Sequence, residues 1–450
     1  MSLISSSQII PKFYVPADQV FDEIRQHLLV DGYDFVLDLE SSHNSTFIDA
    51  INGKEFTDFF SCFASIPIGL NHPKLANPEF IDYIGKVALA KPTNSDVYTE
   101  EYATFIKTFF NIAVPDEFKY GFFIEGGALA VENALKTAFD WKVRKNLSKG
   151  KGEKGSQIIH FQQAFHGRSG YTMSLTNTDP IKIQYYPKFK WPRITNPKIT
   201  FPLDEENLHK VIELENIAVK EIKEAFYQYP DDIAAIIIEP IQGEGGDNHF
   251  RPEFLQKLRT LADENDALLI FDEVQTGLGL TGTFWAFEQL GVTPDIFAFG
   301  KKTQVCGIAA TTRLDDVPDN VFHTPSRINS TWGGNLTDMV RSTRYLEIIQ
   351  EERLLDNVNK QGKYLFSELE DLQKDFPNLV SNIRSRGLFA AFDLPSHDIR
   401  RTFLSTAFNN GLIILPCGER SIRFRPSLNI TKDEIEGGFE IIRKSFAALG

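Results

Sequence analysis

Cysteine is scarce in this sequence, with Cys62, Cys306 and Cys417 the three in 450 residues. They lack metal-ligand spacing and are too few for a disulfide framework, so we expect neither a cysteine metal centre nor a disulfide-stabilised secreted fold. The longest wholly apolar run that we find, Ile233–Ile238, is far shorter than the roughly 20 residues that cross a bilayer. The first residues show no basic region followed by an apolar stretch, as a secretory signal would. We therefore expect a cytoplasmic protein without a membrane partner.

Basic residues are fewer than acidic ones, and the formal net charge is −14 at pH 7. Such a surface argues against a nucleic acid or an anionic membrane as the main partner. We also find neither a Gly-x-Gly-x-x-Gly after a first strand nor a Walker loop, which disfavours a nucleotide-binding enzyme. A chain of this length favours one large domain with a smaller one.

The middle of the chain alternates short apolar runs with amphipathic segments. We expect strands at 122–124, 158–161, 235–239, 268–272, 296–299 and 308–312, and helices at 128–144 and 252–265. This alternation predicts an α/β domain with a mostly parallel sheet and helices on both faces.

The end of the chain has a different pattern, which predicts an α+β region. Helices are expected at 338–353, 357–376, 399–409 and 431–449, and strands at 383–394, 412–415 and 422–424. Near the start we expect one helix at 20–29 and a hairpin within 48–58.

Two of the expected strands are each followed by a charged residue. The first ends in Asp272, and the second leads to Gly300 and Lys301. Ligands of open α/β sheets bind at the carboxyl ends of the strands, so we expect both groups in one crevice. Burial can convert a lysine into a nucleophilic amine that forms a Schiff base with an aldehyde, and a carboxylate can keep a pyridine nitrogen protonated. These properties suit pyridoxal phosphate, whereas a surface ion pair is the alternative that residue types leave open.

The residues around this pair carry a resemblance to a known family. A hydrophobic pair, any residue, Asp-Glu-Val, a later Gly, Pro-Asp-Ile and Gly-Lys follow one another in the stretch LLIFDEVQTGLGLTGTFWAFEQLGVTPDIFAFGKKTQVCG (268–307). This order resembles the signature of class III pyridoxal-phosphate aminotransferases, and the ending Gly-Lys-Lys-Thr-Gln-Val-Cys-Gly resembles the lysine 6-aminotransferases within that family. The resemblance implies fold type I and places Lys301 at the Schiff-base position, with Lys302 one residue too late.

The same resemblance implies a division into domains. Residues 1–75 would be an N-terminal segment that contributes to the small domain. Residues 76–334 would form the large cofactor-binding domain, and residues 335–450 the C-terminal small α+β domain.

Five further residues are implied as ligands of pyridoxal 5′-phosphate. Gly127 and Ala128 open a helix, where backbone N–H groups suit a phosphate, although the hydroxyl side chains usual in the family are missing. Phe165 matches the residue that stacks on the cofactor ring. Gln275 is expected near the ring hydroxyl and the substrate, with Asp272 on the ring nitrogen. Thr331 is expected to reach the cofactor phosphate of the partner subunit, which predicts a homodimer.

Three charged residues are implied as the substrate site. Arg168 matches a carboxylate-binding arginine, while Glu244 and Arg423 match a pair that lets one pocket accept two substrates. Glu244 would pair with Arg423 when the amino donor is bound, and would move away when 2-oxoglutarate brings a carboxylate. We expect Arg425 to be a solvated neighbour of Arg423.

Together these features predict an enzyme that transfers the ε-amino group of L-lysine to 2-oxoglutarate. Its products would be L-glutamate and 2-aminoadipate 6-semialdehyde, which cyclises to piperideine 6-carboxylate. Ornithine or 4-aminobutyrate transamination is the alternative, because one methylene is worth only about 1–3 kcal/mol in an apolar pocket. A decarboxylase or aminomutase of the same fold and a cofactor-free interaction protein are further alternatives.

Overall fold

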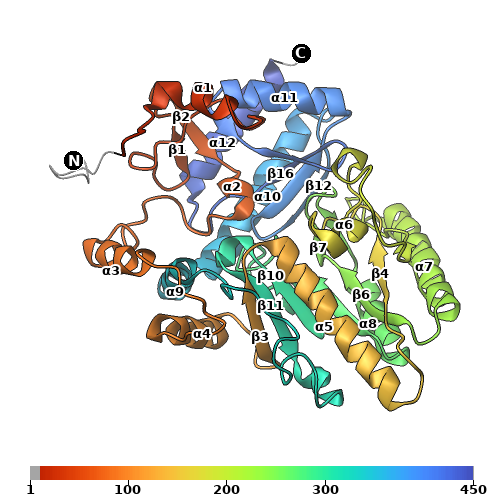
Figure 1. Ribbon diagram of the computed structural model, residues 1–450. Coiled ribbons are helices and arrows are strands. Elements are labelled where there is room, and N and C mark those ends of the chain that lie inside the picture. The colour runs from red at the N-terminus through yellow and green to blue at the C-terminus, as the bar shows by residue number, and fades with distance from the viewer. Residues whose placement is uncertain (1–10, 449–450) are drawn as a thin grey trace.

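A mostly parallel sheet forms the centre of the computed structural model, which describes residues 11–448 (Figure 1). Its strand order in this part of the chain is β3-β11-β10-β9-β6-β4-β5. The bounds are β3 (Phe118–Ile124), β4 (Gln157–Phe161), β5 (Arg193–Ile194), β6 (Ile233–Ile238), β9 (Leu268–Asp272), β10 (Ile296–Phe299) and β11 (Cys306–Thr311). Strand β11 runs antiparallel to both its neighbours, and every other pairing is parallel.

Both faces of this sheet are buried, as the apolar strand sequences predict. Leu269 and Phe271 of β9 belong to one core, whereas Leu268 and Ile270 belong to the other. Successive side chains of a strand point to opposite faces, so a strand covered on both sides has no polar face. Helices α4 (Glu100–Ile112), α7 (Glu205–Gln228) and α8 (Pro252–Glu264) contribute to the first core, and α5 (Gly127–Ser148) contributes to the second.

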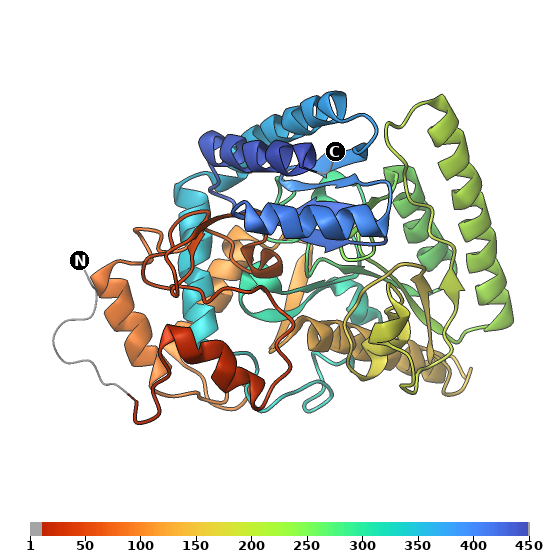
Figure 2. The same cartoon turned by 90° about the horizontal axis from the view of Figure 1, so that it is seen from above.

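A second layer of structure is built mainly from the end of the chain, and Figure 2 shows its helices above the central sheet. Its four-stranded sheet has the order β12-β13-β16-β15. The elements are α10 (Leu354–Asp375), β12 (Ser381–Arg386), β13 (Phe389–Asp393), α11 (His397–Asn409), β14 (Leu412–Ile413), β15 (Leu415–Cys417), β16 (Ser421–Phe424) and α12 (Lys432–Ala447). Helix α12 begins at the capping box of Thr431 and Glu434.

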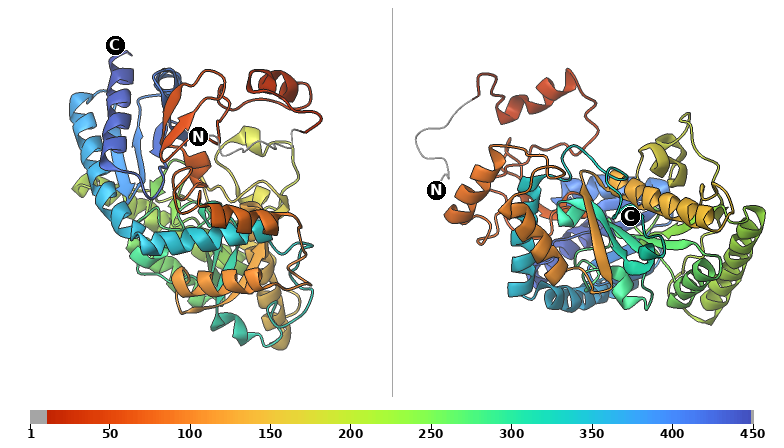
Figure 3. Two further views of the ribbon diagram at one scale, coloured as in Figure 1. Left: turned by 90° about the vertical axis from the view of Figure 1, so that its left-hand side faces the viewer. Right: turned by 60° about the horizontal axis from the view of Figure 1, so that its bottom comes forward.

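The remaining elements join the two layers. They are α1 (Val20–Arg25), β1 (Thr46–Ile48), β2 (Glu55–Asp58), α2 (Ser61–Ala64), α3 (Pro78–Ala88), α6 (Gly170–Leu175), β7 (Ile241–Gln242), β8 (Asn248–His249) and α9 (Leu336–Glu351). Helix α9 packs against α3 and α4 (Figure 3). The segment α2 is a left-handed turn, with φ between 42° and 64°. Within residues 11–448, we find no helix with an apolar stretch long enough to cross a bilayer.

The beginning of the chain packs against its end. Strand β2 pairs in parallel with β14, and the Phe59 ring lies against Gly438 of α12. A Cβ atom on Gly438 would lie 2.2 Å from that ring, so the contact requires glycine, whereas Gly437 faces open space. The beginning and the end of the chain thus share one core, and the division at residues 75 and 335 stays a prediction.

Three local expectations differ from the structure. Helix α7, which covers 205–228 from its N-cap Asp204, was not among the expected helices. The single strand expected at 383–394 is wrong, because Gly387 adopts φ 58° and turns the chain into the hairpin of β12 and β13. The strand expected at 412–415 is divided between two sheets, since β14 pairs with β2 and β15 with β16.

Candidate active site

A cavity of about 320 Å³ lies where the carboxyl ends of β4, β6, β9 and β10 meet the start of α5. Ala298 is the register partner of Asp272, so the residues that follow β9 and β10 reach the same edge of the sheet. The cavity is lined by Gly127, Ala128, Phe165, His166, Gly167, Arg168, Glu239, Glu244, Asp272, Val274, Gln275 and Lys301. Of the predicted site residues, Arg423 and Thr331 are not part of this lining.

Lys301 is separated from the end of β10 by Gly300 and opens a short 3-10 turn. Its φ of 53° is left-handed, a conformation that side-chain-bearing residues rarely adopt and that is enriched at functional sites. Burial lowers the pKa of Lys301 to about 8, and the charge of Arg423 acts in the same direction. Within the described residues its amine makes no hydrogen bond or ion pair. A lysine of this kind is a neutral amine for part of the time near physiological pH.

Asp272 is held by a histidine to which the sequence analysis gave no role. His166 Nδ1 donates to Asp272 Oδ2 at 2.7 Å, and the backbone N–H of Val274 donates to Oδ1 at 3.0 Å. Burial alone would lower the pKa of His166, but the hydrogen bond and charge of Asp272, with the charge of Glu239, raise it overall. The two hydrogen bonds fix the orientation of the Asp272 carboxyl group at the floor of the cavity.

Glu239 is a second buried carboxyl group in the cavity that was not predicted as a site residue. Its two oxygens accept hydrogen bonds from the backbone N–H groups of Phe165, at 2.9 Å, and Gly243, at 3.1 Å. It therefore fixes two loops of the site to the end of β6. Burial raises the pKa of Glu239 to about 7, while the charge of His166 opposes this rise.

The amino end of α5 forms another wall of the cavity. Gly126 has a φ of 97°, and a Cβ atom on Gly127 would lie 2.9 Å from the Val274 side chain. Glycine is thus needed for the close approach of this helix to the loop after β9. A helix N-terminus with exposed N–H groups favours an anion such as a phosphate.

Two side chains of the cavity lining, Phe165 and Arg168, are not fully buried. Phe165 is half-buried, and Arg168 is exposed and makes no hydrogen bond or ion pair within the described residues. An arginine without a partner beside an amine-bearing cavity is available to a carboxylate.

The ion pair expected between Glu244 and Arg423 does not form in this structure. Glu244 pairs instead with Lys182, and Arg423 Nη1 donates to Gln275 Oε1 at 3.1 Å. Glu244 Oε2 and Arg423 Nε are both buried and have no hydrogen-bond partner. Each of the two side chains therefore keeps an unused polar atom.

The expectation that Arg425 is solvated is wrong. Its side chain is 0% exposed and donates two hydrogen bonds to Asp247, at 2.9 and 2.5 Å. Arg425 lies one residue beyond β16 and shares a face with Arg423, so both reach Gln275. Residues two apart on a strand point to the same side, and here the small α+β layer buries that side.

Thr331 lies on an exposed loop before α9, away from the cavity lining. Lys302, one residue after Lys301, is buried, and its amine is 3.4 Å from the Gln275 carbonyl oxygen. Lys301, not Lys302, lines the cavity.

A sequence model described as "Aminotransferase class-III" matches residues 31–446. The chain belongs to the class III aminotransferases. It is 50% identical over 434 residues to an L-lysine-epsilon aminotransferase of Mycobacterium tuberculosis, with 96% of each chain covered. It is 32% identical to a mitochondrial 4-aminobutyrate aminotransferase of Mus musculus, over 88% of this chain and 81% of the relative.

A solved structure of lysine aminotransferase from M. tuberculosis in the internal aldimine form has a TM-score of 0.95. The two chains are 49% identical, and the match covers 97% of this aminotransferase and all of the other chain. The expected fold type I, enzyme class and cofactor, pyridoxal 5′-phosphate, are confirmed.

The residues of the cavity fit this cofactor. An amine without a partner, a buried carboxylate held by a histidine and a glycine helix start line one space. In addition, His166 Nε2 is buried and has no hydrogen-bond partner within the described residues. This polar atom of the cavity lining therefore needs a partner from outside the chain.

Replacing Glu239 with glutamine should change how stability depends on pH. The pKa of this carboxyl is about 7 when folded, against an ordinary value of 4.5, so between these values the folded enzyme binds a proton that the unfolded chain releases. The stability of the wild type relative to Glu239→Gln should therefore fall as pH rises from about 5 to 8, by roughly 3 kcal/mol at most. Urea unfolding of both proteins across this range measures the difference, and a difference independent of pH would contradict the assignment.

Proposed function

We propose that this aminotransferase transfers the ε-amino group of L-lysine to 2-oxoglutarate. The products are 2-aminoadipate 6-semialdehyde, which cyclises to piperideine 6-carboxylate, and L-glutamate. One observation carries the proposal: a single cavity joins Lys301, Asp272 and the free Arg168 in a chain that is 50% identical to an L-lysine-epsilon aminotransferase. The weaker identity to a 4-aminobutyrate aminotransferase makes that activity the second candidate.

Each side chain of the cavity has a proposed role toward pyridoxal phosphate, which when bound supplies an electron sink for the substrate carbon. Lys301 attaches it covalently, Asp272 holds its ring nitrogen protonated, and Phe165 stacks on its ring. The N–H groups of Gly127 and Ala128 bind its phosphate, and Gln275 lies near its ring hydroxyl. His166 and Glu239 position Asp272 and the Phe165 loop.

Lys301 also moves the proton of the reaction. Its amine, when not bonded to the cofactor, would take a proton from the substrate carbon that bears the amino group and would hold it for return. A pKa of about 8 suits both directions, because the efficiency of a general base is greatest when its pKa lies near the working pH.

Lys301→Ala should abolish covalent attachment of the cofactor and lower turnover by at least about 10³-fold, whereas Lys302→Met should retain both. Lys302 is the matched control, because it is the adjacent buried lysine and does not line the cavity. Borohydride reduction followed by mass spectrometry of the peptides identifies the modified residue. Cofactor fixed covalently to Lys302, or fixed by borohydride to any residue of Lys301→Ala, would refute the assignment.

The substrate is recognised at both of its ends. Arg168 binds the α-carboxylate of lysine, so the ε-amine and not the α-amine reaches Lys301. When 2-oxoglutarate enters, Arg168 binds the distal carboxylate and Arg423 the one next to the oxo group. Bidentate arginine contacts suit both carboxylates.

A panel of amino donors tests this function. Lysine, ornithine and 4-aminobutyrate are each supplied with 2-oxoglutarate, and both glutamate and the oxidised donor are identified. Lysine should give the highest kcat/KM, by about tenfold or more over a donor one methylene shorter. Preference for 4-aminobutyrate, or no glutamate from any donor, would overturn the proposed function.

Glu244 acts as a switch between the two half-reactions. With lysine bound, it covers the Arg423 charge, and with 2-oxoglutarate bound it moves to Lys182. The unpaired atoms of Glu244 and Arg423 and the ion pair between Glu244 and Lys182 support these two positions. Lys182 thus stabilises the position in which Arg423 is open to a carboxylate.

Glu244→Gln should raise the KM for lysine more than the KM for 2-oxoglutarate. An uncovered arginine disfavours the uncharged part of lysine that lies beside it, while a carboxylate substrate neutralises the same arginine. Steady-state kinetics with each substrate varied in turn measure the two constants. Equal changes in both would remove the switch.

We further propose a homodimer in which Thr331 reaches the partner subunit's cofactor phosphate. Thr331 lies outside the cavity of its own chain, on a loop that is tied to residues 94–95 by hydrogen bonds of 2.6 to 3.1 Å. Its chain neighbour Trp332 is exposed, and so are Leu89 and Tyr98, which lie close in sequence to residues 94–95. Exposed apolar residues of this kind are typical of an interface. Sedimentation as a monomer at micromolar concentration would contradict this arrangement.

We propose a cytoplasmic location. The three thiols, none of which forms a disulfide, support it. Recovery of the native protein mainly from an oxidising compartment would count against it.

A further inference from the structure

A fully buried ion pair lies just outside the cavity. Asp247 and Arg425 are both 0% exposed and share two hydrogen bonds. The Arg425 guanidinium also lies 3.4 Å from the centre of the Phe389 ring. A buried ion pair stabilises a fold only weakly against an apolar substitute, so a function for these charges is worth seeking.

The pair is connected to the cavity through Gln275. Its side-chain oxygen accepts hydrogen bonds from Arg425 Nε at 3.2 Å and Nη2 at 2.9 Å, and from Arg423 Nη1 at 3.1 Å. One neutral oxygen therefore holds two guanidinium groups. Asp247 neutralises Arg425, whereas no carboxylate within residues 11–448 pairs with Arg423. The network thus fixes the Arg423 side chain without neutralising its charge.

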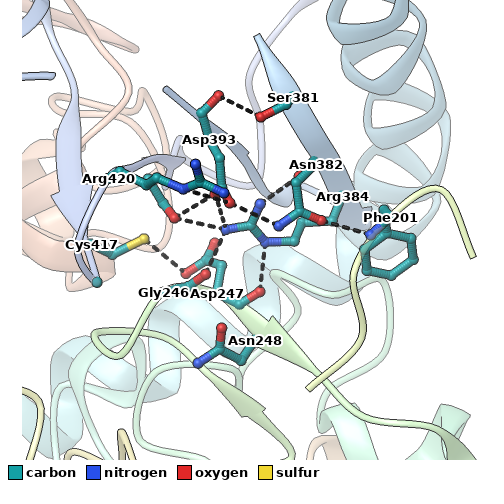
Figure 4. Close-up of polar contacts among 12 residues, drawn as sticks. Phe201, Gly246, Asp247, Asn248, Ser381, Asn382, Arg384, Asp393, Cys417 and Arg420 are labelled. Atoms are coloured by element: carbon teal, nitrogen blue, oxygen red, sulfur yellow. Dashed lines mark hydrogen bonds and ion pairs between the residues drawn. The ribbon is translucent and has the colours of Figure 1, made fainter. Parts of the chain in front are cut away.

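Asp247 is itself held in place from the other layer. Arg384 of β12 donates to the Asp247 carbonyl oxygen at 2.9 Å and to that of Gly246 at 2.6 Å (Figure 4). Arg384 also pairs with Asp393 of β13 at 2.9 Å. The turn that carries Asp247 begins at Gly243 and Glu244, so these contacts join the cavity loop to the small sheet.

We propose that Asp247 and Arg425 are positioning residues for carboxylate recognition, acting through Gln275 on Arg423. Their ion pair neutralises the charge of Arg425. The charge of its neighbour Arg423 stays oriented and available to bind the carboxylate of 2-oxoglutarate. This inference rests on the proposed role of Arg423 toward 2-oxoglutarate. A neutral glutamine suits the link, because a carboxylate there would neutralise Arg423 as well.

Arg425→Lys separates the positioning role from a purely structural one. Lysine retains the charge opposite Asp247 but lacks the planar fork that also reaches Gln275. Arg259→Lys is the matched control, since Arg259 pairs with the buried Asp295 at 2.8 Å and lies outside the cavity. Each holoenzyme is tested for thermal unfolding, for calorimetric binding of glutarate, a dicarboxylate that cannot react, and for the KM of each substrate.

Arg425→Lys should weaken glutarate binding and raise the KM for 2-oxoglutarate by about tenfold, the usual effect of losing a hydrogen bond to a charged group. The KM for lysine should change much less, and the unfolding temperature should fall no more than in Arg259→Lys, which binds glutarate normally. In an Arg423→Lys background, Arg425→Lys should cause no further loss of glutarate affinity, because the effect passes through Arg423.

Unchanged glutarate affinity in Arg425→Lys, or an additive loss in the double variant, would overturn the positioning role. Equal loss of both substrates with a large fall in unfolding temperature would show a structural role only. Gln275→Glu gives an independent test, since it should abolish glutarate binding by neutralising Arg423. Glutarate binding needs no turnover, so a failure of the proposed lysine activity would appear in the donor panel and in the KM values, and not in the glutarate titrations.

Discussion

The parallel pairing of β9 with β10 is the constraint on which the site depends. In this pairing Ala298 lies opposite Asp272, so the carboxyl ends of the two strands reach the same edge of the sheet. Lys301 is thereby brought near Asp272, although the two are distant along the chain. Burial on both faces of the sheet fixes this register, because a slip by one residue would turn apolar side chains to the wrong side. The acid and the amine are therefore held by the core of the large domain and not by flexible loops.

The buried charged and polar side chains around the site are held in hydrogen-bonded sets. His166 supports Asp272, Glu239 ties two loops with its oxygens, and Gln275 joins two arginines. In each case a group that would be costly to bury alone has a hydrogen-bonded partner. Lys301 and Arg168, which line the cavity, have no hydrogen-bonded partner within the described residues, and a ligand can supply one there.

Much of this arrangement could be predicted from the sequence, because strands buried on both faces are unbroken apolar runs. The bounds of β9 and β10 agree with the expected ones, and with them the place of Asp272 and Lys301. The sequence did not indicate that His166 would meet a carboxylate 106 residues away, because only folding makes that contact. Arg425 was misjudged, since alternation along a strand predicts which side a residue faces but not what covers it. Helix α7 was missed although its buried Val211, Ala218, Ile222 and Ala225 recur at helical spacing.

The pairing of β2 with β14 has a consequence for how the protein is made. The first strands of the chain leave the ribosome long before the partners that bury Phe59, Phe424 and the ring-facing Gly438 have been synthesised. Until translation ends, the part of this cover that comes from the end of the chain is missing, and partly covered apolar surfaces attract chaperones or other nascent chains. The last strand of the large sheet ends at Thr311, so that sheet can form before the layer that carries Arg423 has been synthesised.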